Sequence, residues 1–160
     1  MKIGFIGLGN VGSKLASSLL RQGFDLTVRD PNRAAVQPFL DRGAIWADSP
    51  RKMAEQVDMI ITCLPNPSVS ASVMEADDGV LEGLRKDAIW AEMSTTDELE
   101  VRRLGDKVLQ RGAEPIDCPV SGGCHRAETG NISIFVGGER RAFERAFPAL
   151  RAMGRSILHT

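Results

Sequence analysis

The sequence predicts an α/β fold in which a mainly parallel sheet carries helices on both faces. Short apolar runs alternate with segments of helical periodicity along the whole chain. The almost wholly apolar run Met59 to Leu64 is typical of a strand buried on both faces of a parallel sheet. No repeat, linker or low-complexity tract interrupts this pattern, so one doubly wound domain is expected to fill residues 1–160.

The first half of the chain alternates between the two kinds of element. Strands are expected at Lys2 to Gly7, Leu26 to Asp30, Ala44 to Ala47 and Met59 to Leu64. Helices are expected at Asn10 to Arg21, at Arg33 to Asp41 and from the cap Ser49-Pro50. Val11, Leu15 and Leu19 recur at helical spacing, which gives the first of these helices one apolar face.

The second half continues in the same way after the break at Pro65-Asn66-Pro67. Helices are expected at Val69 to Glu75, Thr96 to Arg111 and Arg140 to Met153. Strands are expected at Ala88 to Glu92, Glu114 to Cys118, Ile132 to Val136 and Ser156 to His159. The last helix is expected to turn Phe143, Ala146, Phe147 and Leu150 inward and to bend near Pro148. Ligands of such folds bind at the carboxyl ends of the strands.

Composition excludes several classes of partner. The net charge of −1 gives no general attraction to nucleic acid or to an anionic membrane. The start of the chain does not resemble a secretory signal, and no apolar run is long enough to span a bilayer. Three cysteines, an odd number, indicate reduced thiols in a cytoplasmic protein. Cys118, Cys124 and His125 match no zinc-binding spacing, so no metal site is expected.

A glycine motif follows the first strand and opens the first helix. Residues 7–12 read Gly7-Leu8-Gly9-Asn10-Val11-Gly12, a G-x-G-x-x-G in the context that dinucleotide binding requires. The glycines allow a tight turn, close approach of a pyrophosphate and close helix–strand packing, and the helix N-terminus faces the phosphates.

The second strand ends on a carboxylate. Asp30 can accept hydrogen bonds from both hydroxyls of an adenosine ribose and would repel a 2′-phosphate, which favours NAD over NADP. Arg29 and Arg33 flank it and could soften that preference, and Asp30 before Pro31 could also simply form a turn.

Four later segments narrow the assignment: "TCLPNP" at 62–67, "AEMSTT" at 91–96, "DCPVSGG" at 117–123 and "TGNISIFVGG" at 129–138. In this order they resemble the β-hydroxyacid dehydrogenase family, which includes 3-hydroxyisobutyrate dehydrogenase and tartronate semialdehyde reductase. 6-Phosphogluconate dehydrogenase and the imine reductases are relatives of that family. The resemblance covers essentially the whole chain and implies a Rossmann-like cofactor domain.

The resemblance also implies roles for particular residues. Leu64, Pro65, Val69 and Thr95 match positions that line the cofactor, and Ser121, Gly122 and Gly123 match the substrate-binding loop. The chemistry agrees, because Ser121 offers a hydroxyl and the two glycines offer backbone N–H groups to a small carboxylate. Thr95 has a competing role, since Thr95 and Glu98 form a capping-box pattern. A plain Gly-Gly turn is the competing interpretation of the loop.

The sequence departs from the family in what it lacks. The resemblance implies an acid/base lysine and an all-helical C-terminal domain that also builds a homodimer or tetramer, and both are absent from residues 1–160. None of Lys2, Lys14, Lys52, Lys86 and Lys107 falls at the family position. We therefore expect no catalytic residue in this chain, and we expect it to bind cofactor but to be largely inactive in hydride transfer to a small β-hydroxy acid.

Several alternatives remain open at this point. The chain could be a stand-alone, non-catalytic NAD-binding or sensing module, or an imine-reductase-like domain, against which Asp30 argues mildly. His125 is expected to be an exposed loop residue rather than a replacement acid/base. Arg126 could add a contact to a second carboxylate of the substrate.

Overall fold

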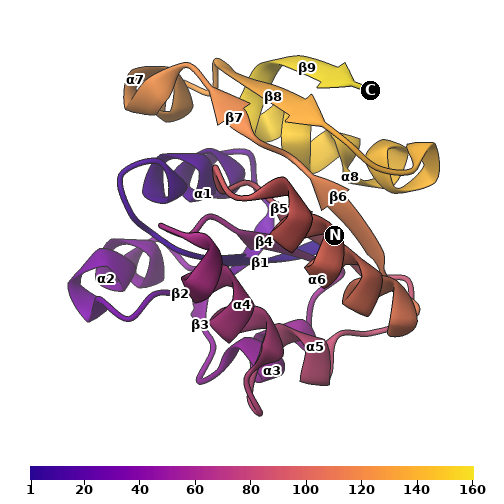
Figure 1. Ribbon diagram of the computed structural model, residues 1–160. Coiled ribbons are helices and arrows are strands. Elements are labelled where there is room, and N and C mark those ends of the chain that lie inside the picture. The colour runs from indigo at the N-terminus through magenta and orange to yellow at the C-terminus, as the bar shows by residue number, and fades with distance from the viewer.

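A six-stranded parallel sheet forms the centre of the molecule (Figure 1), in the order β3-β2-β1-β4-β5-β6. The computed structural model describes residues 1–160. Its strands are β1 Lys2–Ile6, β2 Asp25–Arg29, β3 Ile45–Trp46, β4 Met59–Thr62, β5 Ile89–Glu92 and β6 Glu114–Asp117. The order reverses on either side of β1, as the predicted doubly wound fold requires, and this fold class is confirmed.

Helices cover both faces of this sheet. They are α1 Gly12–Arg21, α2 Arg33–Asp41, α3 Pro50–Ala54, α4 Pro67–Glu75, α5 Val80–Gly83 and α6 Glu98–Gln110. Alternate strand residues enter two separate cores. Phe5 and Ile61 join the core under α1 and α2, and Ile60 and Trp90 join the core under α3, α5 and α6. This alternation is the period-2 pattern of a strand buried on both faces.

The last part of the chain departs from the expected single sheet. It contains β7 Val120–Ser121, α7 Gly123–Glu128, β8 Ile132–Val136, α8 Arg140–Met153 and β9 Gly154–His159. β7 pairs antiparallel with β8, and β8 pairs parallel with β9, so these strands form a second, three-stranded sheet. One isolated antiparallel bridge, between Asp117 and Gly137, joins this sheet to the main one. α1 and α8 lie side by side between the two sheets (Figure 1).

Some local predictions were wrong. The short helices α5 and α7 and the strand β7 were not predicted, because two to six residues carry too little periodicity to identify them. Phe147 was expected to point inward, yet it is 41% exposed. Ala142, Ala146 and Ala149 form the buried face of α8 together with Leu150. Small residues on this face let the helix approach the neighbouring elements closely, and the Phe147 ring packs edge-on against Phe143 instead.

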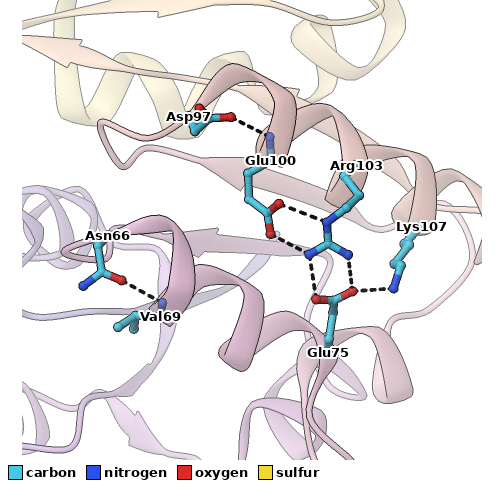
Figure 2. A network of polar contacts seen from close by, with 7 residues as sticks. All are labelled: Asn66, Val69, Glu75, Asp97, Glu100, Arg103 and Lys107. Carbon is cyan, nitrogen blue, oxygen red and sulfur yellow. Dashed lines mark hydrogen bonds and ion pairs between the residues drawn. The ribbon is translucent and has the colours of Figure 1, made fainter.

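An ion-pair network joins α4 to α6 (Figure 2). The Arg103 guanidinium donates to both oxygens of Glu75 at 2.6 and 2.8 Å, and it also donates to Glu100. Lys107 adds a second cation to Glu75. Two-pronged pairing of a guanidinium with a carboxylate is the strong form of this interaction, so the network fixes the C-terminal end of α4 against α6.

We predict a pH-dependent contribution of Glu75 to stability. Hydrogen bonds from Arg103, then those from Lys107, lower the pKa of Glu75 from 4.5 to about 2. A pKa below that of the unfolded state stabilises the fold above about pH 4.5, and this stabilisation is lost as the pH falls toward 2. Because the group is near solvent, Glu75→Gln should lower the unfolding free energy by only about 1 kcal/mol at pH 7.

Urea unfolding of both proteins at pH 7 and near pH 2 measures this contribution. The difference should become small near pH 2, where Glu75 is partly protonated in the folded protein and fully protonated in the unfolded chain. Asp77→Asn provides the control, since the Asp77 side chain is exposed in a turn and forms no ion pair, and this substitution should leave the unfolding free energy unchanged at both pH values. An equal loss of stability at both pH values would contradict the prediction.

Candidate functional site

A cavity of about 680 Å³ opens at the carboxyl ends of the central strands. Its lining residues are Gly7, Gly9, Asn10, Val11, Gly12, Asp30, Pro31, Cys63, Leu64, Pro65, Val69, Met93, Ser94, Thr95 and Val120. They come from the loops after β1, β2, β4 and β5, from the first turns of α1 and α4, and from β7. Every cofactor residue predicted from the sequence lies in this set except Leu8, whose side chain is buried.

The glycine turn after β1 is tightly packed at both ends and open in the middle. A Cβ atom at Gly7 would lie 2.1 Å from the carbonyl oxygen of Cys63, and one at Gly12 would lie 2.0 Å from the carbonyl oxygen of Gly7. A Cβ atom at Gly9 would meet nothing within 4 Å. The turn thus keeps free space at its centre, in front of the first turn of α1, where backbone N–H groups have no partner within the helix.

Asp30 is held firmly at the edge of this turn. Its Oδ2 accepts a hydrogen bond from the Leu8 backbone N–H at 2.7 Å, and its Oδ1 accepts one from Asn32 N–H at 2.8 Å. Leu8 therefore contributes to the site through its backbone N–H, which holds Asp30, and its side chain is buried away from the cavity. These bonds tie the end of β2 to the glycine turn and fix the direction of the carboxylate.

The two arginines that flank Asp30 are engaged with Trp46. The Arg29 and Arg33 guanidinium carbons lie 5.1 and 4.1 Å from its ring centroid, which is cation–π geometry. Arg29 also donates to the Ala47 carbonyl. Neither arginine forms an ion pair with Asp30, so the carboxylate keeps its charge available at the cavity.

The opposite wall is formed by the loops after β4 and β5. Asn66 caps α4 by accepting a hydrogen bond from Val69 N–H at 2.9 Å (Figure 2), which fixes the first turn of α4. The capping box expected at Thr95 and Glu98 was wrong, because Asp97 caps α6 by accepting from Glu100 N–H. Asp97 lies directly before the first helical residue, whereas Thr95 lies too early. Thr95 is exposed at the cavity instead.

The Ser121-Gly122-Gly123 loop lies next to this cavity but outside its lining. Ser121 ends β7 and is exposed, and Gly122 precedes α7. Gly122 and Gly123 have φ values of 130° and 72°, a region that favours glycine. The loop is thus a strand-to-helix connection rather than a plain turn between strands. His125 and Arg126 are exposed, and the Arg126 stem lies against Gly122.

Five lining residues were missed by the sequence analysis: Pro31, Cys63, Met93, Ser94 and Val120. Each lies within a few positions of a predicted site residue, so adjacency to a strand end was the available signal.

Burial, and then the charge of Glu92, raise the pKa of the Cys63 thiol to about 12. Cys63 is therefore a neutral wall residue at neutral pH.

The sequence profile of the NAD binding domain of 6-phosphogluconate dehydrogenase matches residues 2–160. The chain belongs to this family. The domain is 40% identical to 3-sulfolactaldehyde reductase of Escherichia coli over 157 residues, 98% of this chain and 53% of that protein. It spans about half the length of the curated relatives it matches.

Solved structures agree with this assignment. Mycobacterium tuberculosis 3-hydroxyisobutyrate dehydrogenase with L-serine gives a TM-score of 0.93 at 28% identity, covering 99% of this chain and 53% of that one. Psf3 in complex with NADP⁺ and 2-OPP gives 0.95 at 27% identity, covering 99% and 56%. The domain is thus an NAD-binding domain of the hydroxyacid dehydrogenase type, and the resemblance to that family is confirmed.

The residues of the cavity fit the cofactor of this family. The open space at Gly9 admits a pyrophosphate, and the carboxylate of Asp30 can accept from ribose hydroxyls. The lining contains no lysine or histidine, and no group of three or more His, Cys, Asp or Glu side chains is placed to hold a metal ion.

None of the helices combines the length and the apolarity that crossing a membrane demands.

Proposed function

We propose that this domain is the cofactor half of an NAD-dependent dehydrogenase that acts on small β-hydroxy acids or the corresponding semialdehydes. The observation that carries the proposal is the convergence of the glycine turn, Asp30 and the loops after β4 and β5 on one cavity, beside the Ser121–Gly123 loop. Names of the relatives support a substrate of this chemical class.

Each part of the site has a definite task in this proposal. Gly9 leaves room for the pyrophosphate, and the first turn of α1 offers it N–H groups. Asp30 accepts from the adenosine ribose and disfavours a 2′-phosphate, which selects NAD over NADP. Leu64, Pro65, Val69 and Thr95 line the remaining cofactor surface. The bound nicotinamide supplies the hydride acceptor or donor.

The loop Ser121-Gly122-Gly123 is assigned to the substrate. Its exposed hydroxyl and the backbone N–H groups of the two glycines are donors of the kind that hold a carboxylate. The partner of the domain is then a small anionic molecule rather than nucleic acid or a membrane. The three cysteines are free thiols, which agrees with a reducing, cytoplasmic location.

We expect the 160-residue chain to bind NAD⁺ with little turnover. The lining of its cavity contains no lysine or histidine, and Lys14, Lys52 and Lys107 are engaged in ion pairs on the surface. A missing acid/base costs about 10²–10⁴-fold in rate, so turnover should stay below about 0.1 s⁻¹ against a typical value of about 10 s⁻¹.

Calorimetric titration with NAD⁺ and NADP⁺ tests the expected cofactor binding, and steady-state assays with 3-hydroxyisobutyrate test the expected lack of turnover. Binding of NAD⁺ in preference to NADP⁺ with negligible turnover supports the proposal. Turnover at ordinary enzyme rates would refute the expectation that residues 1–160 contain no group for the proton-transfer step. No binding of either dinucleotide would refute the cofactor site itself.

A further inference from the structure

Glu92 is a fully buried carboxyl group two residues before Ser94, which lines the cavity. It ends β5, has an exposed fraction of 0%, and forms no ion pair. Its Oε1 accepts hydrogen bonds from Ser94, while its Oε2 has no hydrogen-bond partner. The hydroxyls of Thr62 on β4 and Ser70 on α4 lie nearby and favour the ionised form, but burial prevails and raises the pKa of Glu92. A carboxyl group in this position costs folding free energy.

Glu92 is linked to the cavity wall by the hydrogen bonds that its Oε1 atom accepts from Ser94. Oε1 accepts from the Ser94 backbone N–H at 2.9 Å and from the Ser94 hydroxyl at 2.5 Å. Ser94 Oγ in turn accepts from the Leu64 backbone N–H at 2.7 Å. Because the hydroxyl has a single proton, which goes to Glu92, its lone pairs are left to face Leu64. Glu92 thereby sets the direction of the Ser94 side chain.

This chain of bonds joins the two loops that form one wall of the site. Leu64 belongs to the loop after β4, and Ser94 to the loop after β5, and both line the cavity. Without an acceptor at Glu92, the Ser94 N–H would be buried unpaired and the hydroxyl would be free to rotate away from Leu64. The separation of the two loops would then no longer be fixed.

We propose that Glu92 is a positioning residue for the dinucleotide site, which acts through Ser94 to hold the Leu64 and Thr95 loops at the spacing that the cofactor needs. This inference rests on the cofactor site proposed above. The role requires Glu92 to accept hydrogen bonds and does not require its negative charge. Two substitutions of similar size, Glu92→Gln and Glu92→Leu, should therefore differ in their effect on NAD⁺ binding.

Calorimetric titration of NAD⁺ into the 160-residue chain and its variants tests this role. Glu92→Gln keeps an acceptor for Ser94, and its Kd should stay within about threefold of the unsubstituted chain. Glu92→Leu removes the acceptor and should raise Kd about tenfold or more. Glu82→Leu is the matched control, because Glu82 pairs with Arg111 away from the cavity, and its Kd should not change.

A double-mutant cycle separates positioning from a general loss of structure. If Glu92 acts through Ser94, Ser94→Ala alone should weaken binding about as much as Glu92→Leu, and the double variant should be no weaker than the poorer single variant. Additive effects on Kd would overturn the proposal. Thermal unfolding and circular dichroism of each variant are recorded alongside, and rescue by glutamine is the readout that a merely structural residue would not share.

The remaining outcomes are equally informative. If Glu92→Leu does not fold, Glu92→Asp keeps a carboxylate but withdraws it by one methylene group from Ser94, and it should show the same loss of affinity. Unchanged binding in a folded Glu92→Leu or Glu92→Asp variant would overturn the inference alone. Failure of the unsubstituted chain to bind NAD⁺ would overturn the proposed function and this inference together.

Discussion

Gly9→Ala is expected to weaken NAD⁺ binding about hundredfold, roughly 2.7 kcal/mol, while leaving the fold intact. The added methyl group meets nothing within 4 Å in the unliganded domain, so it costs no packing. It does fill the space through which the pyrophosphate approaches the backbone. Calorimetric titration and thermal unfolding, measured on the same preparation, should show the loss of affinity without a large shift in Tm.

Gly12→Ala is the matched comparison, three residues along the same turn. Its methyl group would lie 2.0 Å from the Gly7 carbonyl oxygen, an overlap that only backbone movement can relieve. We expect this variant to lose about 3 kcal/mol or more of stability and to lose binding as a consequence. If Gly9→Ala bound NAD⁺ normally, the pyrophosphate could not lie at this turn. A normal Tm for Gly12→Ala would show that the turn relaxes easily.

Asp30→Ala should weaken NAD⁺ binding by about tenfold to hundredfold and narrow the preference over NADP⁺. Charge-assisted hydrogen bonds from two ribose hydroxyls are worth about 1.5–3 kcal/mol, and removing the carboxylate also removes its repulsion of a 2′-phosphate. Arg29 and Arg33, stacked on Trp46 nearby, would then be the dominant charges at this edge of the site. Parallel titrations with the two dinucleotides measure both effects.

Asp30→Asn controls for the role of Asp30 in the turn. The amide oxygen can still accept from one of the two backbone donors, Leu8 and Asn32, so local structure is better preserved than in the alanine variant. The NADP⁺ affinity of the Asp30→Asn variant should rise or stay level while its NAD⁺ affinity falls. An unchanged ratio of the two affinities in both variants would remove Asp30 as the determinant of cofactor choice.

The central sheet could be predicted from the sequence because each of its elements has a strong local signal. The apolar strands and the turn residues between them fix β1, α1, β2 and β4 within a few positions. The second sheet could not be predicted, since nothing local distinguishes β8 from a seventh strand of the main sheet. Its separation depends on the antiparallel pairing of the two-residue strand β7, which is a tertiary contact.

In the candidate site, too, the residues with a local sequence signal could be predicted, and those placed by tertiary contacts could not. The glycine turn and Asp30 are contiguous with strand ends, so pattern alone indicates them. Ser94 and Val120 line the cavity because the tertiary fold brings the end of β5 and the strand β7 to the same edge as the glycine turn, and no spacing in the sequence indicates this. Glu92 looks like an ordinary polar residue at the end of a strand. Its complete burial depends on tertiary packing around the end of β5, which the sequence does not show.

The three cysteines give the domain two very different kinds of sulfur chemistry. Cys63 and Cys118 are thiols whose pKa is raised by burial, so alkylating and oxidising reagents find almost no thiolate at either one. Cys124 is exposed, one residue beyond the Ser121–Gly123 loop. Reactivity toward electrophiles is therefore concentrated at a single atom beside the loop that we propose for the substrate, while the sulfur that lines the cavity stays chemically inert.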